Sequence, residues 1–289
     1  MNDAPRTITR RQALGGGVAL GAAALLPAPA LAFASPRIAV TVQGSGPDVI
    51  LIHGVDSSTA VWKATLIRDY SRRFHLVQIA GFGGFPARGN ASGDIVKGVA
   101  DEVIRYISQM KLNRPAIIGH SMGGTIALMI AARFPARIGK AMVVDMLPQP
   151  AGILGADAAG IRPLADGLRN LTATPQGRQL FDSVVGMFGG ASTPAERSDS
   201  GVTARALHEL ALTDLTPELP RITAPLTVVY ATPRPSETAD PARVTATYRA
   251  AYKGARTARL VPIANSGHMI MYDQPLAFQA TVRTFLAAR

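Results

Sequence analysis

The chain has 289 residues, a formal net charge of +11, 47% hydrophobic and 17% charged residues, and no cysteine. Such an apolar composition excludes a disordered chain, which would be apolar-poor and charge-rich. The lack of cysteine excludes disulfides, a thiol nucleophile and a zinc–thiolate site, while the basic charge raises nucleic acid and anionic membranes as partners.

Residues 1–34 have the three-part composition of an export signal. A polar segment that ends in two arginines precedes an apolar run over 13–26, two prolines, and small residues that allow cleavage after Ala32 or Ala34. Residues 9–14, which read TRRQAL, resemble a twin-arginine signal. The alternative is an uncleaved anchor, which needs about 20 strongly apolar residues. We therefore predict a periplasmic or secreted protein with no stable membrane insertion after removal of the signal.

The charge of the remaining chain is dispersed. Removal of the signal, which carries three arginines and one aspartate, lowers the net charge from +11 to +9. The arginines that remain form no long block and are typical of a solvated surface. We therefore predict no nucleic-acid partner.

After the signal, short apolar segments alternate with segments of helical length. We expect strands over 37–42, 49–52, 76–79, 115–118, 141–144, 226–230 and 260–263, and helices over 95–110, 125–134 and 279–287. Continuous apolar runs such as 49–52 are typical of strands buried on both faces. Strands joined by helical crossovers predict an α/β fold with a mostly parallel central sheet and helices on both faces.

The strand pattern stops over residues 148–221. Helical patches over 164–171, 180–188 and 204–212 are joined there by turns that contain glycine and proline. We interpret this stretch as a helical cap inserted above the working edge of the sheet. The catalytic core would then comprise residues 35–147 and 222–289.

A serine lies in a sharp turn between a strand and a helix. Residues 119–123 read Gly-His-Ser-Met-Gly, between the strand that ends at Ile118 and the helix expected from Thr125. This is G-x-S-x-G in the strand–turn–helix context that the motif requires. The glycines let neighbouring backbone pass without a Cβ clash, and the helix N-terminus favours developing negative charge. Ser121 is the candidate nucleophile.

A neutral serine needs a base to become reactive. Among the five histidines, His268 follows the last predicted strand, so its loop would lie at the same sheet edge as the serine. We predict that His268 is the base. His53 is expected to fix its own loop and His120 to point away from the reacting edge. His75 and His208 are expected to be structural.

Acyl transfer also needs two hydrogen-bond donors for the oxyanion. The backbone N–H of Met122, which follows the nucleophile, would supply one. The loop after His53-Gly54 would supply the other, and the residue expected there is Val55.

His53-Gly54, the 119–123 motif and Ser266-Gly267-His268, in this order, resemble the α/β-hydrolase family. The resemblance covers about residues 37–289. It implies a Ser–acid–His triad whose acid lies between the other two residues in the sequence.

The position of the acid departs from the usual family pattern. The family usually places it in a Gly-x-x-Asp turn after the strand at 226–230, but here the turn reads Ala-Thr-Pro-Arg-Pro, and Glu237 and Asp240 come later. Some family members place the acid after the preceding strand, where Asp145 stands. We predict Asp145, with Glu237 and Asp240 as alternatives. Asp273 is expected to cap the final helix.

These residues predict an exported hydrolase of small carboxylic esters that needs neither cofactor nor metal. Ser121 would attack the ester carbonyl and His268 would transfer the proton. One alternative is a perhydrolase, and another is a non-catalytic binding protein on a hydrolase scaffold. A third is a proline-releasing aminopeptidase, which would bind the substrate ammonium with acidic residues of the cap. The candidates for that role are Asp157, Asp166, Asp182, Glu196, Asp199, Glu209, Asp214 and Glu218.

Overall fold

The computed structural model describes residues 33–62, 71–154, 157–172, 174–177, 179, 198–233 and 240–288. All structural statements below concern these residues. The predicted signal up to residue 32 and the helical patch 180–188 lie outside the described residues, as do Asp182, Glu196 and Glu237.

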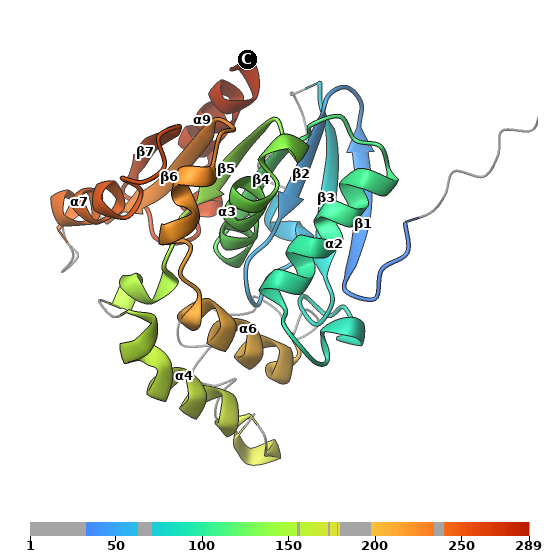
Figure 1. Ribbon diagram of the computed structural model, residues 1–289, viewed down its shortest axis with the longest axis vertical. Helices are drawn as coiled ribbons and strands as arrows, with labels where there is room; N and C mark the ends of the chain where they lie inside the picture. The colour runs from blue at the N-terminus through green and yellow to red at the C-terminus, as the bar shows by residue number, and fades with distance from the viewer. Residues whose placement is uncertain are drawn as a thin grey trace, which may run out of the picture. The chain divides into compact units, whose positions relative to one another are not determined.

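Seven described strands form one sheet in the order β1-β3-β2-β4-β5-β6-β7 (Figure 1). They are β1 (Ile38–Gly44), β2 (Asp48–Ile52), β3 (Arg73–Ile79), β4 (Ala116–His120), β5 (Lys140–Val144), β6 (Leu226–Thr232) and β7 (Ala258–Ala264). Only β1, at one edge, is antiparallel to its neighbour β3; the other neighbouring pairs are parallel. The predicted strands and the mostly parallel α/β fold are confirmed.

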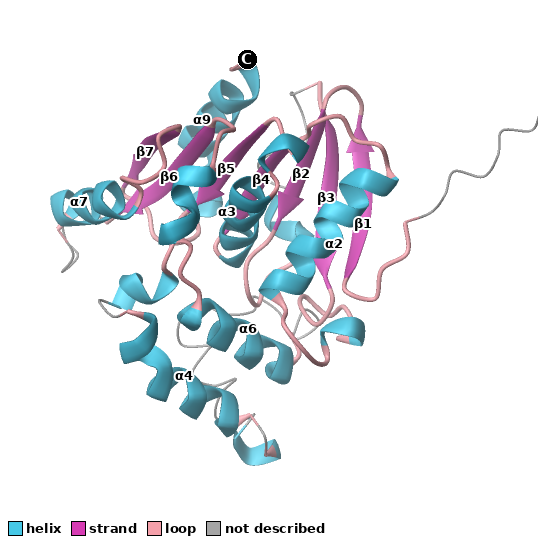
Figure 2. Ribbon diagram, viewed as in Figure 1, coloured by secondary structure: helices cyan, strands magenta, loops and turns pink. Residues whose placement is uncertain are grey.

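Helices cover both faces of the sheet (Figure 2). The longer ones beside it are α2 (Val96–Gln109), α3 (Met122–Arg133), α7 (Pro241–Ala251) and α9 (Pro275–Ala287). In the central strand β2, Ile50 and Ile52 pack in a core with α2 and α3, whereas Val49 and Leu51 pack in a second core with α9. Burial of alternate side chains on opposite faces explains the continuous apolar run of this strand.

Short helices connect these elements. They are η1 (Thr59–Trp62), η2 (Arg88–Asn90), η3 (Pro135–Arg137), η4 (Pro150–Leu154), η6 (Thr216–Arg221) and α8 (Ile270–Asp273). None of the described helices combines the length and the apolar character that crossing a bilayer requires.

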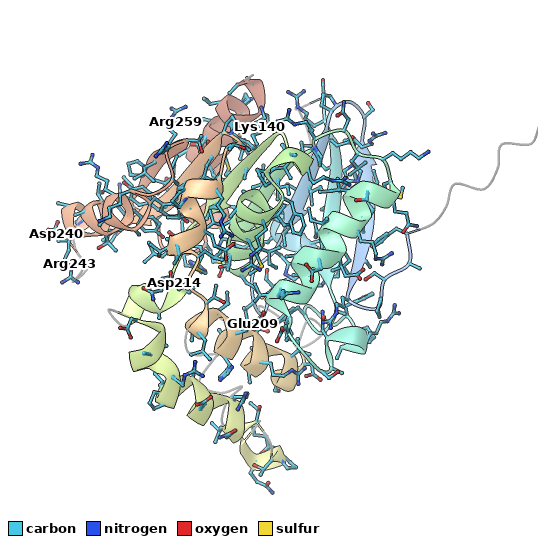
Figure 3. All side chains as sticks on the ribbon, viewed as in Figure 1. Lys140, Glu209, Asp214, Asp240, Arg243 and Arg259 are labelled. Carbon is cyan, nitrogen blue, oxygen red and sulfur yellow. The ribbon has the colours of Figure 1, made fainter. Side chains whose placement is uncertain are left out.

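Helix α7 was not predicted from the apolar pattern. Its only buried residue is Tyr248, so its sequence lacks an apolar stripe. The helix is instead specified at its start, where the Asp240 carboxylate accepts a hydrogen bond of 2.9 Å from the Ala242 N–H and Pro241 is the first helical residue (Figure 3).

Two helices of the region predicted as a cap lie side by side beyond the carboxyl ends of the parallel strands (Figure 1). They are α4 (Ala158–Leu171) and α6 (Ser200–Leu212). Both begin earlier than the predicted patches because an aspartate caps each N-terminus. Asp157 accepts from the Gly160 N–H at 2.7 Å, and Asp199 accepts from the Val202 N–H at 2.8 Å.

Helix α6 is fastened to the core of the molecule. The carboxylate of Glu209, on α6, accepts hydrogen bonds of 2.7–2.9 Å from the backbone N–H groups of residues 95–97 at the start of α2 (Figure 3). A carboxylate at this position satisfies unpaired N–H groups and complements the helix dipole. The N–H of Asp199 also donates to the carbonyl oxygen of Gly81, after β3, at 2.7 Å.

Candidate active site

Ser121 stands in the turn between β4 and α3 with φ 54° and ψ −120°. A positive φ is uncommon for a residue with a side chain, and such strain is concentrated at functional sites. The turn is held by its own backbone, because the Ser121 N–H donates to the Val144 carbonyl at 3.0 Å and the Ser121 carbonyl accepts from the Gly124 N–H at 2.7 Å. The side chain of Ser121 is half-buried at the carboxyl edge of the sheet.

Both glycines of the motif are required by close backbone contacts. A Cβ on Gly119 would lie 1.9 Å from the carbonyl oxygen of Gly123. A Cβ on Gly123 would lie 2.1 Å from the carbonyl oxygen of Ile52, at the end of β2. The turn therefore packs directly against β2, which brings the loop after β2 to the serine.

The loop after β2 lies beside Ser121. A Cβ on Gly54 would be 2.9 Å from the Cβ of Ser121. The next N–H in this loop belongs to Val55, and Met122 follows the serine. Among the described residues neither of these two N–H groups donates to a protein acceptor, so both are free for a ligand oxygen. Their role in an oxyanion hole remains a prediction.

His53 fixes this loop from beneath. Its Nδ1 lies 2.8 Å from the Gly54 carbonyl oxygen and its Nε2 lies 3.1 Å from the N–H of Ile79. Because an N–H must donate to Nε2, the proton of the neutral ring is on Nδ1. Complete burial lowers the pKa of His53 to about 4, so the ring is neutral at pH 7. Both nitrogens are occupied, in agreement with the prediction that His53 holds the loop.

His268 and Asp145 meet at the same edge of the sheet. The Nδ1 of His268, in the loop after β7, lies 2.7 Å from Oδ2 of Asp145, which directly follows β5. The His268 side chain is 48% exposed and that of Asp145 is 13% exposed, so solvent reaches the ring more than the carboxylate. In the described chain no hydrogen bond joins His268 to the Ser121 hydroxyl, a contact that is often long until substrate binds.

The other candidate acids are placed differently. The Asp240 carboxylate caps α7, and the structure gives it no contact with His268. Glu237 lies outside the described residues. Of the acids that can be compared, Asp145 is the one that the fold brings to His268.

The prediction that His120 points away from this edge is wrong, because the structure places its ring against the loop of His268. Its Nε2 lies 3.0 Å from the carbonyl oxygen of His268, and the two rings are 4.7 Å apart between centroids. Since a carbonyl only accepts, the Nε2 of His120 carries the proton and donates. The ring therefore supports the backbone of the predicted base.

Asp273 does not cap the final helix, which corrects a second expectation. Helix α9 begins at Pro275 after Gln274, which makes no side-chain capping bond. The Asp273 carboxylate instead accepts from the Gly267 N–H at 2.8 Å and from the Ser266 hydroxyl at 3.5 Å. It thus ties the loop that carries His268 to the start of the last helices.

We expect the free energy of unfolding to fall as the pH is lowered from 7 to 5. His53 and His120 are 0% and 2% exposed, and burial lowers their pKa values from 6.5 to about 4 and about 3. Between pH 6.5 and pH 4 the unfolded chain binds protons that the folded chain does not, so stability is lost as the pH falls. Each imidazole contributes at most about 1.4 kcal/mol per pH unit.

Urea unfolding followed by circular dichroism at pH 7, 6 and 5 measures this loss. The His53→Gln variant removes one of the two groups, so its midpoint is expected to depend less steeply on pH than that of the parent. A parent midpoint that stays constant over this range would contradict the prediction.

The described acidic residues of the predicted cap all have partners. Three of them bind helix N-termini: Asp157 that of α4, Asp199 that of α6 and Glu209 that of α2. The other three bind single groups: Glu218 pairs with Arg133, Asp166 with His208, and Asp214 with the N–H of Thr216. Carboxylates engaged in this way are poorly placed to bind a substrate ammonium. The aminopeptidase alternative therefore lacks support within the described residues.

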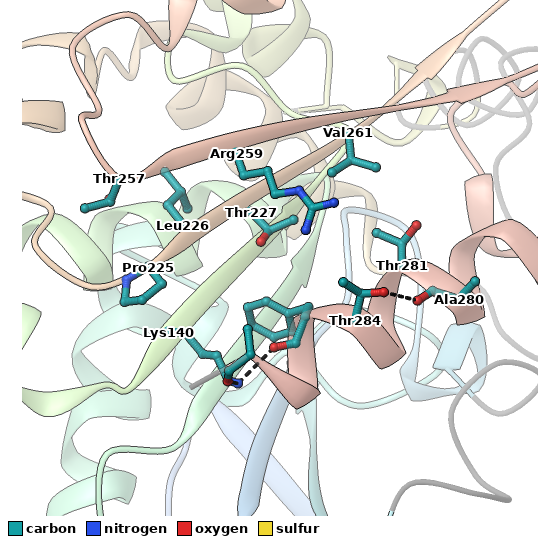
Figure 4. A pocket seen from close by; sticks show the side chains of 12 residues that line it. Lys140, Pro225, Leu226, Thr227, Thr257, Arg259, Val261, Ala280, Thr281 and Thr284 are labelled. Atoms are coloured by element: carbon teal, nitrogen blue, oxygen red, sulfur yellow. Dashed lines mark hydrogen bonds between the residues drawn. The ribbon is translucent and has the colours of Figure 1, made fainter.

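A separate hollow lies at the opposite edge of the sheet (Figure 4). It measures about 300 Å³ and is lined by Lys140, Thr227 and Arg259 near the amino ends of β5, β6 and β7. The Lys140 ammonium donates to the carbonyl oxygens of Phe285 and Leu286 at 2.9 and 3.1 Å, which holds the end of α9. Nowhere among the described residues, this hollow included, do three or more His, Cys, Asp or Glu residues form a group that could hold a metal ion.

The mostly parallel sheet, the strained serine turn and the histidine–carboxylate pair at its carboxyl edge have the arrangement of the α/β-hydrolase fold. Comparison with known families agrees. Residues 49–281 match the alpha/beta hydrolase family, and the chain belongs to this family.

Curated relatives over part of the chain include methyl ester esterases. The chain is 29% identical over 111 residues to the pimeloyl-acyl-carrier-protein methyl ester esterase of Nitrosomonas europaea, covering 38% of this chain and 42% of the relative. It is 31% identical over 112 residues to that of Aeromonas hydrophila, with coverage of 38% and 42%. The chain thus spans about two fifths of the length of these relatives.

Solved structures with the same fold cover most of the chain. An esterase from Exiguobacterium antarcticum has a TM-score of 0.65 at 21% identity, over 87% of this chain and 96% of that chain. The enol-lactonase from Burkholderia xenovorans has a TM-score of 0.63 at 20% identity, over 87% and 96%. At these identities the likeness shows the fold alone.

Proposed function

We propose that the protein is a serine hydrolase that cleaves carboxylic esters through an acyl-enzyme on Ser121. The observation that carries the proposal is the 2.7 Å contact between Nδ1 of His268 and Asp145, at the sheet edge where the turn after β4 places Ser121. A carboxylate on Nδ1 fixes the neutral tautomer whose Nε2 accepts a proton, and it stabilises the imidazolium that forms.

The reaction follows from these positions. The Ser121 oxygen attacks the ester carbonyl while His268 accepts the serine proton. The N–H groups of Val55 and Met122 hold the oxyanion of the tetrahedral intermediate. His268 then returns the proton to the leaving alcohol, and the acyl group stays on the serine. Water attacks this acyl-enzyme, with its proton passing to His268, and the free acid and the serine are regenerated.

The relatives support small esters as the substrate class. The two curated relatives are named as methyl ester esterases, and a similar fold occurs in a solved esterase. An ester substrate needs no ammonium site, which accords with the engaged carboxylates of the cap region. Perhydrolysis would use the same acyl-enzyme with hydrogen peroxide in place of water. The assay of ester turnover described next, run with and without peroxide, therefore tests it as well.

A fluorophosphonate probe tests the nucleophile, and nitrophenyl esters of increasing acyl length test the substrate class. We expect the probe to label Ser121, and we expect turnover of esters to exceed that of a prolyl amide. We expect added hydrogen peroxide not to raise the turnover of these esters above the turnover measured in water alone. A folded protein that neither labels at Ser121 nor hydrolyses any ester would support the binding-protein alternative and refute the proposal.

We also propose that residues 1–34 direct export, with the mature enzyme in the periplasm or outside the cell. Support comes from the two arginines, the apolar run and the small residues described above. N-terminal sequencing of the protein from the periplasmic fraction is expected to begin at Phe33 or Ser35. Full-length protein confined to the cytoplasm would contradict this proposal.

A further inference from the structure

The carboxylate of Asp145 is held at both of its oxygens. Oδ2 faces His268, whereas Oδ1 accepts hydrogen bonds from the Ala231 N–H at 2.9 Å and from the Tyr248 hydroxyl at 3.2 Å. The first donor belongs to the neighbouring strand β6 and the second to α7. Asp145 itself has a positive φ of 53°, so its backbone conformation is an uncommon one for a residue with a side chain.

Tyr248 is itself fixed in a stack of three tyrosines. Its ring lies 4.3 Å from that of Tyr230, at 14° between planes, and 6.4 Å from that of Tyr252, at 6°. The side chain of Tyr248 is 7% exposed. The Tyr252 hydroxyl donates to the carbonyl of Met146 at 2.7 Å, so the stack is also anchored next to Asp145.

We propose that Tyr248 is a positioning residue, whose hydroxyl holds Asp145 in the orientation that serves His268. The inference rests on the proposed function for its kinetic consequence, but the contact itself can be tested without a substrate. Tyr248 touches the carboxylate and not the reacting atoms, so it acts through Asp145.

The chemistry of the phenol suits this role. Burial and the nearby Asp145 charge raise the pKa of Tyr248 far above its usual value, so the hydroxyl remains a donor at all working pH values. A donor to the charged form of a carboxylate stabilises that form. The titratable groups that face Asp145 in the described chain are His268, Tyr248, Tyr252 and His120.

The Tyr248→Phe variant keeps the ring and removes the donor. Its matched control is Tyr106→Phe on α2, which removes another buried hydroxyl, one that lies 2.6 Å from Nδ1 of His75. We expect Tyr248→Phe to lower kcat by about tenfold with little change in KM, the effect of losing one hydrogen bond to a charged group. The acid limb of the kcat/KM profile should move to higher pH, because a less stabilised carboxylate raises the proton affinity of the His268–Asp145 pair. Tyr106→Phe should show neither effect.

Proton NMR of the free enzyme provides the readout that does not depend on activity. The low-field Nδ1 proton of His268 is expected to shift in Tyr248→Phe and to stay in place in Tyr106→Phe. If the wild type hydrolyses no ester but the resonance shifts, the proposed function fails and the positioning contact stands. Unchanged resonance and unchanged kinetics in Tyr248→Phe would overturn the inference, as would equal losses in both variants.

Replacement of Tyr248 by meta-fluorotyrosine covers the case in which Tyr248→Phe does not fold. The fluorinated phenol has nearly the same shape and is a stronger donor. We expect the acid limb to move to lower pH, opposite to the shift for phenylalanine. A limb that stays in place, or that moves to higher pH, would contradict the assignment.

Discussion

The Ser121→Ala variant is expected to lose about a millionfold in kcat on nitrophenyl esters, as removal of a triad nucleophile does. The side-chain oxygen of Ser121 forms the acyl-enzyme bond, and no neighbouring group in the proposed mechanism replaces it. Ester binding should persist, because the alanine leaves the backbone donors in place. Alanine has the same reluctance to adopt φ 54° as serine, so the melting temperature should change little.

Ser108→Ala is a matched control for this experiment. Ser108 lies on α2, where its hydroxyl donates to the Ile104 carbonyl at the surface. This control should keep wild-type turnover. If Ser121→Ala retained more than a trace of activity while remaining folded, another nucleophile would be at work and the mechanism would be wrong.

The Asp145→Asn variant is expected to lose about ten-thousandfold in kcat, with KM changed far less. The amide has no charge to stabilise the His268 imidazolium, and its NH₂ group favours the wrong tautomer of the ring. The comparison variant is Asp240→Asn, which alters the cap of α7 and leaves the 2.7 Å contact with His268 intact. Stopped-flow or steady-state hydrolysis of one ester distinguishes the two.

Variants of the alternative acids define the result that would contradict the assignment of Asp145. Near-normal turnover in Asp145→Asn, with a large loss in Glu237→Gln or Asp240→Asn, would move the acid to the segment after β6. If all three variants lost turnover, their melting temperatures would be compared, because Asp240 caps α7 whereas Asp145 bonds to His268, Ala231 and Tyr248.

The inner strands of the sheet could be predicted because β2, β4 and β5 are buried on both faces. Each buried strand leaves a continuous apolar run in the sequence, and the run at 49–52 divides between two cores. Helix α7 left no such trace, since Tyr248 alone is buried in it. Its start was marked only by Asp240-Pro241, a short signal that is common in loops as well.

The residues of the candidate site were predictable where the local sequence defines them. Ser121 is marked by its flanking glycines, and His268 by its place after the last strand. The contacts of Tyr248 and His120 could not be predicted, because their partners are more than a hundred residues away in the sequence. These contacts exist only after parallel strands bring distant loops to one edge of the sheet.

The attachment of α6 bears on how this protein could be re-engineered. With Glu209 bound to the start of α2 and Asp199 bound to Gly81, α6 behaves as part of the scaffold although it lies in the inserted stretch. A chimera that exchanges the whole of 148–221 would expose the N–H groups of residues 95–97 and lose their carboxylate. The natural junction for grafting a foreign cap therefore falls before Ser198, with α6 kept together with its own core.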